Sequence, residues 1–398
     1  MKKTILLVAM PDSIHTARWV NQIIDQGWEI YLFPSMGDVN AHHELKGVVI
    51  IRPWNWLHCI VDRVGLNLIT KSIFWLRRRY EKSFPPSRIS RLLKAIKSLH
   101  PDVIHSMEIQ AAGYLTLEAK KAFRGRFPQW IVTNWGSDIF LFGRLQSHSK
   151  KIREVLSQCD YYSCECQRDV NLAHSFGFEG ELLPVFPNTG GFDLSVLKSL
   201  RQNRTSTRRL IMLKGYQNWA GRALVGLRAL ERCADLLQGF EVCIYSARPD
   251  VVLAAELFTE ANGIPTRIVP FGTPHHEMLA LHAQARISIG LSISDAISAS
   301  LLEAMVMGSF PIQSCTACAD EWIKHGVSGM IVPPEDPNIV EMAIRTALTD
   351  DELVNQAAKI NWWTAQERLD GSSLKQKTID MYSKLLQIQH RNATFVSE

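Results

Sequence analysis

Strand-like and helix-like segments alternate along almost the whole chain, and this alternation restricts the fold more than any other feature of the sequence. In the first half the strand-like segments are Thr4–Met10, Gly27–Phe33, Val48–Ile51, Asp102–His105 and Trp130–Asn134, and the helix-like segments are Thr16–Gln26 and Arg88–Leu99. Strands that alternate with helices pair in parallel and form a sheet with helices on both faces. The sequence therefore predicts an α/β protein with a doubly wound parallel sheet.

A polar stretch without apolar periodicity interrupts the alternation at residues 200–207 and predicts a linker. A second series of strand-like segments follows at Arg209–Leu213, Glu241–Tyr245, Arg267–Val269, Ile287–Leu291 and Phe310–Gln313, with helix-like segments at Gly221–Cys233, His276–Ala283, Ser300–Met307 and Pro337–Thr346. A chain of 398 residues is long enough for two such domains. We expect them at 1–200 and 208–371, facing each other across a cleft, with a final helix near Ser372–Gln389.

The composition is that of an ordinary soluble protein, with 46% hydrophobic and 21% charged residues. The apolar run at the start stops at Pro11-Asp12, which is too short for the core of a signal peptide. No apolar run approaches the roughly 20 residues of a membrane-spanning helix. We therefore expect a cytoplasmic protein.

The eight cysteines do not suggest a disulfide scaffold in a chain of this size. Two close pairs, Cys164-x-Cys166 and Cys315-x-x-Cys318, raise the alternative of a metal or redox site. A zinc site takes four ligands, commonly from two pairs of similar spacing, whereas these pairs are far apart and differently spaced. We expect reduced, structural cysteines and no bound metal.

The segment Arg63–Lys97 is strongly basic, with ten Lys or Arg residues and one acidic residue, Glu81. Five aromatic residues lie in or beside it, namely Trp54, Trp56, Phe74, Trp75 and Tyr80. Basic residues with interfacial aromatics are typical of a surface that lies against anionic lipid headgroups. The alternative is a solvated helical face, which most charge runs are. A nucleic-acid partner is not expected, because no known reading motif is present.

Polar residues follow several of the predicted strands in the first half. They include His15, His105, Glu108 and Asp138. In doubly wound sheets, ligands bind beyond the carboxyl ends of the strands, so these positions are candidates for a site. A histidine at a strand end is also commonly a structural residue with its hydrogen bonds satisfied.

In the second half, Asp295 and Glu303 lie eight residues apart and are separated by small or apolar residues that lead into a helix. A helix start offers unpaired N–H groups and partial positive charge to an anion. Phosphate at the backbone, with carboxylates for hydroxyl groups on either side, describes a nucleotide sugar. The alternative for Glu303 is a capping box, Ser300-x-x-Glu303.

Two further segments point to the same ligand. Lys214-Gly215 ends a predicted strand and Arg222 begins the next helix, and two cations beside glycines suit a diphosphate. Taken alone, they could equally be ordinary surface cations. In Val269–Thr273, main-chain groups around Phe271 and Gly272 could pair with the edge of a base.

Several spaced elements of the second half resemble the donor-binding signature of retaining glycosyltransferase family 4. They are Asp295-x7-Glu303, Leu302-Glu303-Ala304-Met305-x-x-Gly308-x-x-Pro311-Ile312 and Glu321-Trp322-Ile323-x-x-Gly326-x-x-Gly329-x-Ile331-Val332-Pro333. A looser similarity covers the first half, through Asp102–His105 and the segment Phe186–Asp193, which looks like the family's "PNGVD". The family has the GT-B fold, in which two Rossmann-like domains face each other and a final helix crosses back to the first.

The resemblance implies that Glu303 binds the ribose of a nucleoside diphosphate sugar, with UDP expected rather than GDP, and that Asp295 lies near the sugar. It implies that Lys214 and Arg222 hold the diphosphate without a metal or other cofactor, and that amides around Ser298, Ala299 and Ser300 meet the sugar and the phosphates. His15, His105 and Asp138 are the candidates to orient or deprotonate an acceptor hydroxyl, and Asp295 is a further potential catalytic residue.

The sequence departs from the family pattern at several positions. Asp295 replaces a Glu, Lys214 precedes Arg222 where the family has Arg before Lys, Trp135 stands where many members have His, and residues 11–16 replace a Gly-rich loop.

We therefore expect a retaining, metal-independent glycosyltransferase with a glycan or lipid-linked acceptor in surface polysaccharide or glycolipid synthesis. Its location would be cytoplasmic, at the inner face of the membrane if Arg63–Lys97 binds anionic lipid. Two alternatives remain, a nucleotide-sugar epimerase and a noncatalytic GT-B protein that binds a glycan or a protein partner.

Overall fold

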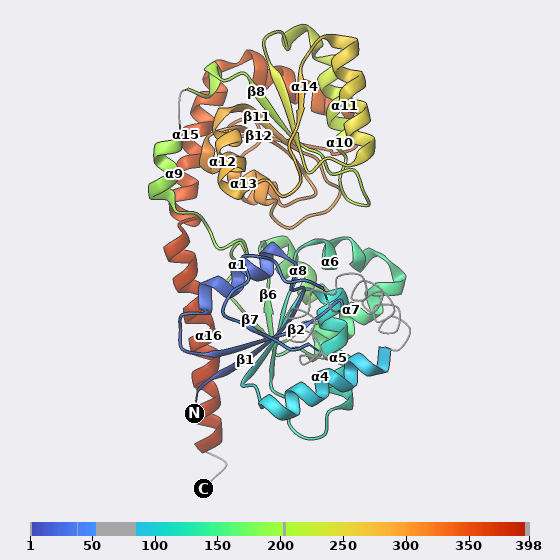
Figure 1. The fold of residues 1–398 in the computed structure, drawn as a ribbon, viewed down its shortest axis with the longest axis vertical. Coiled ribbons are helices and arrows are strands. Elements are labelled where there is room, and N and C mark those ends of the chain that lie inside the picture. Colours follow the sequence, from blue (N-terminus) through green and yellow to red (C-terminus); the bar gives the residue numbers. More distant parts are fainter. Residues whose placement is uncertain (1, 38, 53–84, 202–203, 395–398) are drawn as a thin grey trace, which may run out of the picture. The chain divides into compact units, whose positions relative to one another are not determined.

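The structure is a computed structural model that describes residues 2–37, 39–52, 85–201 and 204–394. The chain forms two compact units, which are shown in Figure 1. Unit 1 comprises Met1–Gly190 and the segment from Leu374 to Glu398, and unit 2 comprises Gly191–Ser373. Residues 200–207, where the sequence predicts a linker, lie inside unit 2, although 202–203 are outside the described residues.

Unit 1 contains a seven-stranded parallel sheet with the strand order β3-β2-β1-β4-β5-β6-β7. The strands are β1 (Thr4–Ala9), β2 (Glu29–Pro34), β3 (Val49–Ile50), β4 (Val103–Met107), β5 (Gln129–Thr133), β6 (Tyr161–Ser163) and β7 (Glu181–Leu182). The order reverses between β1 and β4, and this is the point at which doubly wound sheets bind ligands, beyond the carboxyl ends of the strands.

Helices cover both faces of this sheet (Figure 1). They are α1 (Ile14–Ile23), α4 (Pro85–Leu99), α5 (Tyr114–Ala122), α6 (Ser137–Phe140), α7 (Gln146–Gln158), α8 (Gln167–Ser175) and α16 (Gly371–Thr394), with a π-helical turn at Ile109–Gly113 and a 3-10 turn at Phe142–Arg144. Side chains of β1 alternate between two cores, because successive residues of a strand point to opposite faces. Leu6 and Val8 pack with α4, α5 and α7, whereas Ile5 and Leu7 pack with α1 and α16.

The C-terminal helix α16 is part of unit 1, as the resemblance predicts. Its Tyr382 is fully buried, accepts a hydrogen bond from Trp19 Nε1 at 3.0 Å and bonds His105 Nδ1 at 2.6 Å. Leu385 and Leu386 of the same helix are buried in the core shared with α1. Each buried leucine contributes about 1.5–3 kcal/mol, so the helix is firmly docked on this unit.

Unit 2 contains a six-stranded parallel sheet in the order β10-β9-β8-β11-β12-β13. Its strands are β8 (Leu210–Lys214), β9 (Glu241–Tyr245), β10 (Thr266–Ile268), β11 (Ala285–Gly290), β12 (Phe310–Ser314) and β13 (Met330–Val332). Its helices are α9 (Leu194–Leu200), α10 (Ala223–Arg232), α11 (Pro249–Asn262), α12 (His275–Gln284), α13 (Ala299–Met307), α14 (Pro337–Thr349) and α15 (Asp351–Arg368). Short 3-10 turns lie at Thr205–Thr207, Ala234–Leu236 and Ala319–Glu321.

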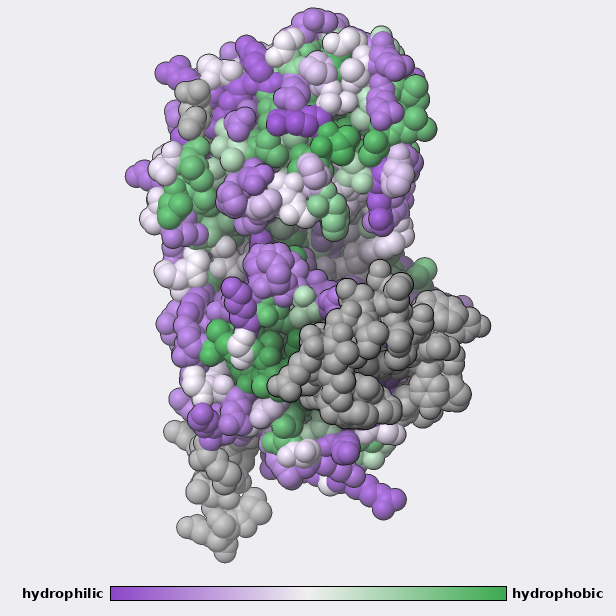
Figure 2. Space-filling model, viewed as in Figure 1, coloured by the Kyte–Doolittle hydropathy of each residue, from purple (hydrophilic) through white to green (hydrophobic). Residues whose placement is uncertain are grey.

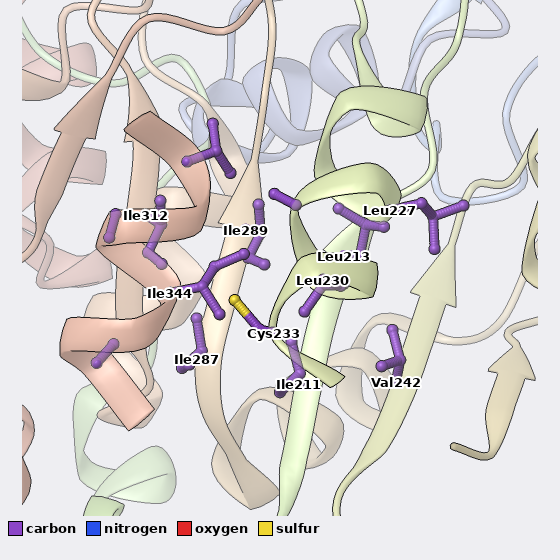
Figure 3. Packing of buried hydrophobic residues seen from close by; sticks show 14 of the residues in the cluster. Ile211, Leu213, Leu227, Leu230, Cys233, Val242, Ile287, Ile289, Ile312 and Ile344 are labelled. Atoms are coloured by element: carbon purple, nitrogen blue, oxygen red, sulfur yellow. The ribbon is translucent and has the colours of Figure 1, made fainter. Parts of the chain in front are cut away.

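The main core of unit 2 lies between its sheet and the helices α10 and α14. Figure 3 shows Leu227 and Leu230 of α10 and Ile344 of α14 directed toward isoleucines of the neighbouring strands. Ile211 on β8 and Ile289 on β11 belong to the same cluster and are at most 1% exposed. A strand buried on both faces needs such a continuous apolar run, which is why the sequence predicts these strands well.

The segments by which the chain enters and leaves unit 2 are hydrogen-bonded to each other. Phe192 N donates to Leu369 O at 2.9 Å, and Gly371 N donates to Phe192 O at 2.9 Å. The first and last segments of unit 2 are therefore adjacent.

Hydrophilic and hydrophobic side chains are intermixed over the visible faces of both units in Figure 2. The hydrophobic colour at the edge of unit 2 marks the place where Figure 1 shows α11, whose Leu253 and Leu257 are each 58% exposed. Among the described helices, none is long and apolar enough to cross a membrane. Most of the basic segment Arg63–Lys97 lies outside the described residues, and only its part in α4 is seen.

Candidate functional site

Lys214 and the Asp295–Glu303 stretch come together at the carboxyl edge of the unit 2 sheet. The Nζ atom of Lys214, the last residue of β8, lies 3.3 Å from Ser298 Oγ and 3.9 Å from Asp295 Oδ2. The loop after β8 also contacts the loop after β11, since Ile293 N donates to Ala220 O at 2.9 Å. Two segments predicted to share a ligand, about 80 residues apart in sequence, therefore form one site.

The loop after β8 is held tightly against the loop after β9. Gly215 N donates to Tyr245 O at 2.7 Å, and a Cβ atom at Gly215 would lie 2.7 Å from Ala247 Cα. Only glycine fits at this distance. Gly215 thus fixes the direction in which the chain leaves Lys214.

The first turn of α13 has no side-chain cap. Its N-cap residue is Ser298, whose hydroxyl bonds Lys214 Nζ and Ser300 Oγ at 2.8 Å instead of a backbone N–H of the helix. Ala299 and Ser300 begin the helix without an acidic residue in its first turn. An uncapped helix start in a row of small residues presents N–H groups and partial positive charge to an anion.

Glu303 does not cap this helix, so the capping-box interpretation is wrong. Its side chain lies between two histidines of α12, with Oε1 2.9 Å from His275 Nε2 and Oε2 3.5 Å from His282 Nε2. Burial opposes the charged form of Glu303, which is only 9% exposed, but hydrogen bonds from both histidines outweigh it and hold its pKa below the ordinary value. Glu303 is therefore a buried, ionised carboxylate at neutral pH.

The sequence analysis missed both histidines. His275 and His282 lie seven residues apart, so they occupy one face of a helix, and this spacing is the signal that was available. Their partner, however, comes from the next helix along the chain. His282 is fully buried and His275 is partly exposed.

Arg222 faces a different partner from Lys214. Its Nε donates to Glu335 Oε1 at 2.8 Å, and its Nη1 donates to Gly221 O at 2.9 Å. Glu335 follows β13 and its side chain is 64% exposed, so this ion pair contributes at most about 1 kcal/mol. The pair is weak enough to be exchanged for a phosphate.

Phe271 and Gly272 form the turn between β10 and α12. Phe271 is 95% exposed, and Gly272 has a φ of +86°, a conformation that favours glycine. An exposed aromatic ring in the turn before α12 is available to contact a base.

In unit 1, His105 occupies a structural position. It is fully buried on β4, with Nε2 2.6 Å from Thr133 Oγ1 and Nδ1 2.6 Å from Tyr382 Oη. Burial lowers the pKa of His105 to about 3. A neutral imidazole with both nitrogens bonded inside the protein is not placed to contact an acceptor.

Asp138 joins two loops at the carboxyl edge of the unit 1 sheet. Its Oδ1 accepts from Trp135 N at 2.8 Å and its Oδ2 accepts from Ile109 N at 3.1 Å. Burial, with a smaller contribution from the charge of Glu108, raises the pKa of Asp138 to about 7. The side chain fixes the loops after β4 and β5 in one arrangement.

Glu108 is a strained residue at the end of β4. Its φ of 121° and ψ of 157° fall in a region that residues other than glycine rarely adopt. Its carboxylate accepts hydrogen bonds from Ala111 N at 2.8 Å and from Ala112 N, which hold the π-helical turn, and burial raises its pKa. Strain of this kind is commonly maintained at functional sites.

The predicted residue His15 lies beside Trp135, which stands where many family members have His. The two rings lie 5.3 Å apart, His15 is half-buried, and the indole Nε1 of Trp135 has no hydrogen-bond partner among the described residues. A buried N–H without a partner is a donor that a ligand hydroxyl could satisfy.

Two family models match the chain. The model described as "Glycosyl transferase 4-like" matches residues 4–161, and the model described as "Glycosyl transferases group 1" matches residues 233–361. No curated protein matches the sequence as a relative.

Solved structures similar to the chain cover nearly its whole length. Sucrose-phosphate synthase from Thermosynechococcus elongatus has a TM-score of 0.69 and 14% identity, covering 97% of this chain and 100% of its own. HepE from Anabaena, in complex with UDP and glucose, has a TM-score of 0.68 and 14% identity, covering 96% of this chain and 100% of its own. Trehalose-6-phosphate synthase from Burkholderia multivorans has a TM-score of 0.68 and 12% identity, covering 100% of this chain and 99% of its own. At these identities the similarity concerns the fold, and it confirms the predicted pair of Rossmann-like domains.

Proposed function

The chain belongs to the GT-B glycosyltransferases that these two family models describe, and we propose that it transfers a sugar from a nucleoside diphosphate sugar to an acceptor hydroxyl with retention of configuration. The observation that carries the proposal is the carboxyl edge of the unit 2 sheet. There Lys214, Asp295, the uncapped start of α13 and the buried Glu303 belong to one unit.

In the proposed complex, Glu303 accepts hydrogen bonds from the ribose hydroxyls. Lys214 and the amides of Ser298, Ala299 and Ser300 bind the diphosphate, and Arg222 joins them by leaving Glu335. Asp295, held near Lys214, contacts the transferred sugar. UDP is the expected nucleotide, since the HepE structures contain UDP or UDP-glucose.

Charge develops on the diphosphate as the glycosidic bond breaks. Lys214 and the α13 amides are fixed donors aimed at this charge, so the proposed catalysis is electrostatic and requires no metal or other cofactor. Asp138 joins the loops after β4 and β5, and His105 links β4 to β5 and to α16. His15 and Trp135 are proposed to contact the acceptor, a glycan or a lipid-linked sugar, with His15 positioned to receive its proton.

Donor binding is tested first by thermal shift with nucleoside diphosphates and their sugars. We expect UDP or a UDP-sugar to raise the melting temperature of the wild type and to leave Glu303→Gln nearly unaffected, because a glutamine donates where the ribose and both histidines require an acceptor. Glu256→Gln, at an exposed position on α11, is the matched control and should keep the full shift. No stabilisation of the wild type by any nucleoside diphosphate would refute the proposal.

Product analysis then separates the proposed reaction from its alternatives. NMR of the product should show the anomeric configuration of the donor, and EDTA should leave the rate unchanged. Conversion of donor alone into an epimer would identify an epimerase instead. Donor binding without transfer to any glycan or lipid-linked acceptor would favour a binding protein.

The proposed membrane partner has its own test. Flotation with vesicles containing anionic phospholipid should recover the protein, whereas neutral vesicles should not. A protein that stays in solution with both would lack the proposed partner, whatever its acceptor.

A further inference from the structure

The carboxylate of Glu303 is held from two sides by one helix. His275 at the start of α12 reaches Oε1 at 2.9 Å, and His282 two turns later reaches Oε2 at 3.5 Å. Each histidine presents the same ring atom, Nε2, to a different oxygen. The carboxylate therefore cannot rotate without losing at least one of these contacts.

Two buried serines lie behind His282. Ser288 Oγ lies 2.9 Å from His282 Nδ1 and 2.6 Å from Ser309 Oγ. The hydrogen bond at one ring nitrogen determines which nitrogen carries the proton. When Ser288 donates to Nδ1, the Nε2–H of His282 points at Glu303.

A carboxylate has about four positions at which it accepts hydrogen bonds, two on each oxygen. His275 takes one position on Oε1, and the buried Nε2 of His282 faces Oε2 at 3.5 Å, so each oxygen keeps a position for a further donor. Two acceptors side by side match the two donors of a vicinal diol, such as the 2′- and 3′-hydroxyls of ribose. The geometry thus suits a diol better than a single hydroxyl.

We propose that His275 and His282 are positioning residues that hold Glu303 in the orientation that recognises a vicinal diol, so that the site selects ribonucleotides over 2′-deoxyribonucleotides. The inference rests on the proposed donor site. It adds that the selectivity depends on two side chains that the sugar itself does not touch. Truncating either histidine frees the carboxylate to rotate, and its two free acceptor positions no longer face the diol together.

The test compares the affinities of UDP and 2′-deoxy-UDP by calorimetry on the full-length protein. The wild type should bind UDP at least about tenfold more tightly, the value of one charge-assisted hydrogen bond. His275→Asn should bring this ratio close to one, because its amide cannot reach Glu303. His275→Gln should restore the ratio, since its amide nitrogen lies where Nε2 was. His276→Ala, at the exposed neighbouring position, is the matched control and should leave the ratio unchanged.

His275 is the better target for substitution because it is partly exposed. His282 is fully buried, so a second variant at that position is used only after its melting temperature has shown that it folds. If His275→Asn weakens both nucleotides by the same factor, the positioning role is refuted while the donor site stands. If the wild type binds UDP but does not distinguish it from 2′-deoxy-UDP, the inference is also refuted. If the wild type binds neither nucleotide, the proposed function fails, and the inference fails with it.

Discussion

Glu303 follows Ser300 by three residues, the spacing at which a glutamate can hydrogen-bond to the start of its own helix. The local sequence is compatible with that role and with ligand binding, and it does not distinguish between them. The folded structure does, because α12 brings His275 and His282 against the carboxylate. The sequence was enough to predict that Glu303 is a functional residue, but not which side chains hold it in place.

The same limit applies to the unit 1 residues chosen because they follow strands. His105 was predicted as the end of a strand, but β4 continues to Met107, and His105 is bonded to Tyr382, which is 277 residues away in sequence. Asp138 is bonded to Ile109 on the neighbouring loop. The sequence predicted that these residues lie near the ends of strands. Their hydrogen-bond partners depend on tertiary contacts, which no local sequence pattern records.

At the residue scale, Lys214→Met should slow sugar transfer by about 10²–10³-fold, the typical cost of losing one preorganised donor to developing charge. The side chain keeps its length, so packing against the loop after β9 should be preserved. The measurement is kcat/KM with saturating acceptor. Lys359→Met, at an exposed position on α15, is the control and should retain the wild-type value. Equal rates for Lys214→Met and the wild type would remove Lys214 from the mechanism.

His105 should make the protein acid-sensitive. Its pKa is about 3 in the folded protein and about 6.5 when unfolded, so below pH 6.5 the unfolded chain binds a proton that the folded protein does not. Stability therefore falls as pH decreases, by about 1.4 kcal/mol per pH unit between those values. Urea unfolding should show about 2 kcal/mol less stability at pH 5 than at pH 6.5 from this group. His105→Gln should lose that much less over the same range; an identical loss in both proteins would contradict the assignment.

At the scale of elements, long apolar strands were predicted nearly to the residue, and weakly patterned elements were missed. β1 was predicted as Thr4–Met10 and is Thr4–Ala9. The 18-residue helix α15 was not predicted, because its buried stripe consists of Val354, Ala357, Asn361 and Ala365 and carries little apolar signal. The short strands β7 and β13 have two and three residues, too few for a periodicity to be detected.

The start of α13 gives the prediction that belongs to this scale. Ala299→Asp adds a carboxylate in the first helical turn, which should leave the unliganded protein as stable or slightly more so, by about 0.3–1 kcal/mol. The same charge should repel a diphosphate and lower the affinity for UDP at least about tenfold. Calorimetry with UDP and with uridine separates the effects, since uridine carries no phosphate and should bind equally to both proteins. An unchanged affinity for UDP would place the phosphates elsewhere.

For the whole molecule, the alternation of strands and helices predicted parallel sheets covered by helices on both faces, and the polar stretch at 200–207 divided them into two. The return of the C-terminal helix was implied only by the resemblance to a family. In physical terms it depends on the fit of Tyr382 between Trp19 and His105, which only the folded structure reveals.

The two units should respond separately to two perturbations. Tyr382→Phe leaves Trp19 Nε1 and His105 Nδ1 without their partner and should destabilise unit 1 by about 1–3 kcal/mol. UDP at 100 times its Kd should stabilise unit 2 by about 2.7 kcal/mol. In differential scanning calorimetry, the variant should lower one transition and the nucleotide should raise the other. A single transition that moves with both would show that the units unfold as one.

The hydrogen bonds between Phe192 and the Leu369–Gly371 segment have a consequence for protein engineering. The two ends of unit 2 are adjacent, which is the geometry of a domain inserted into a host at a single point. Such a cassette can be exchanged between homologous scaffolds through two neighbouring junctions. If unit 2 binds the donor and unit 1 the acceptor, as proposed, chimaeras joined at residues 190/191 and 373/374 would pair the donor preference of one chain with the acceptor preference of another.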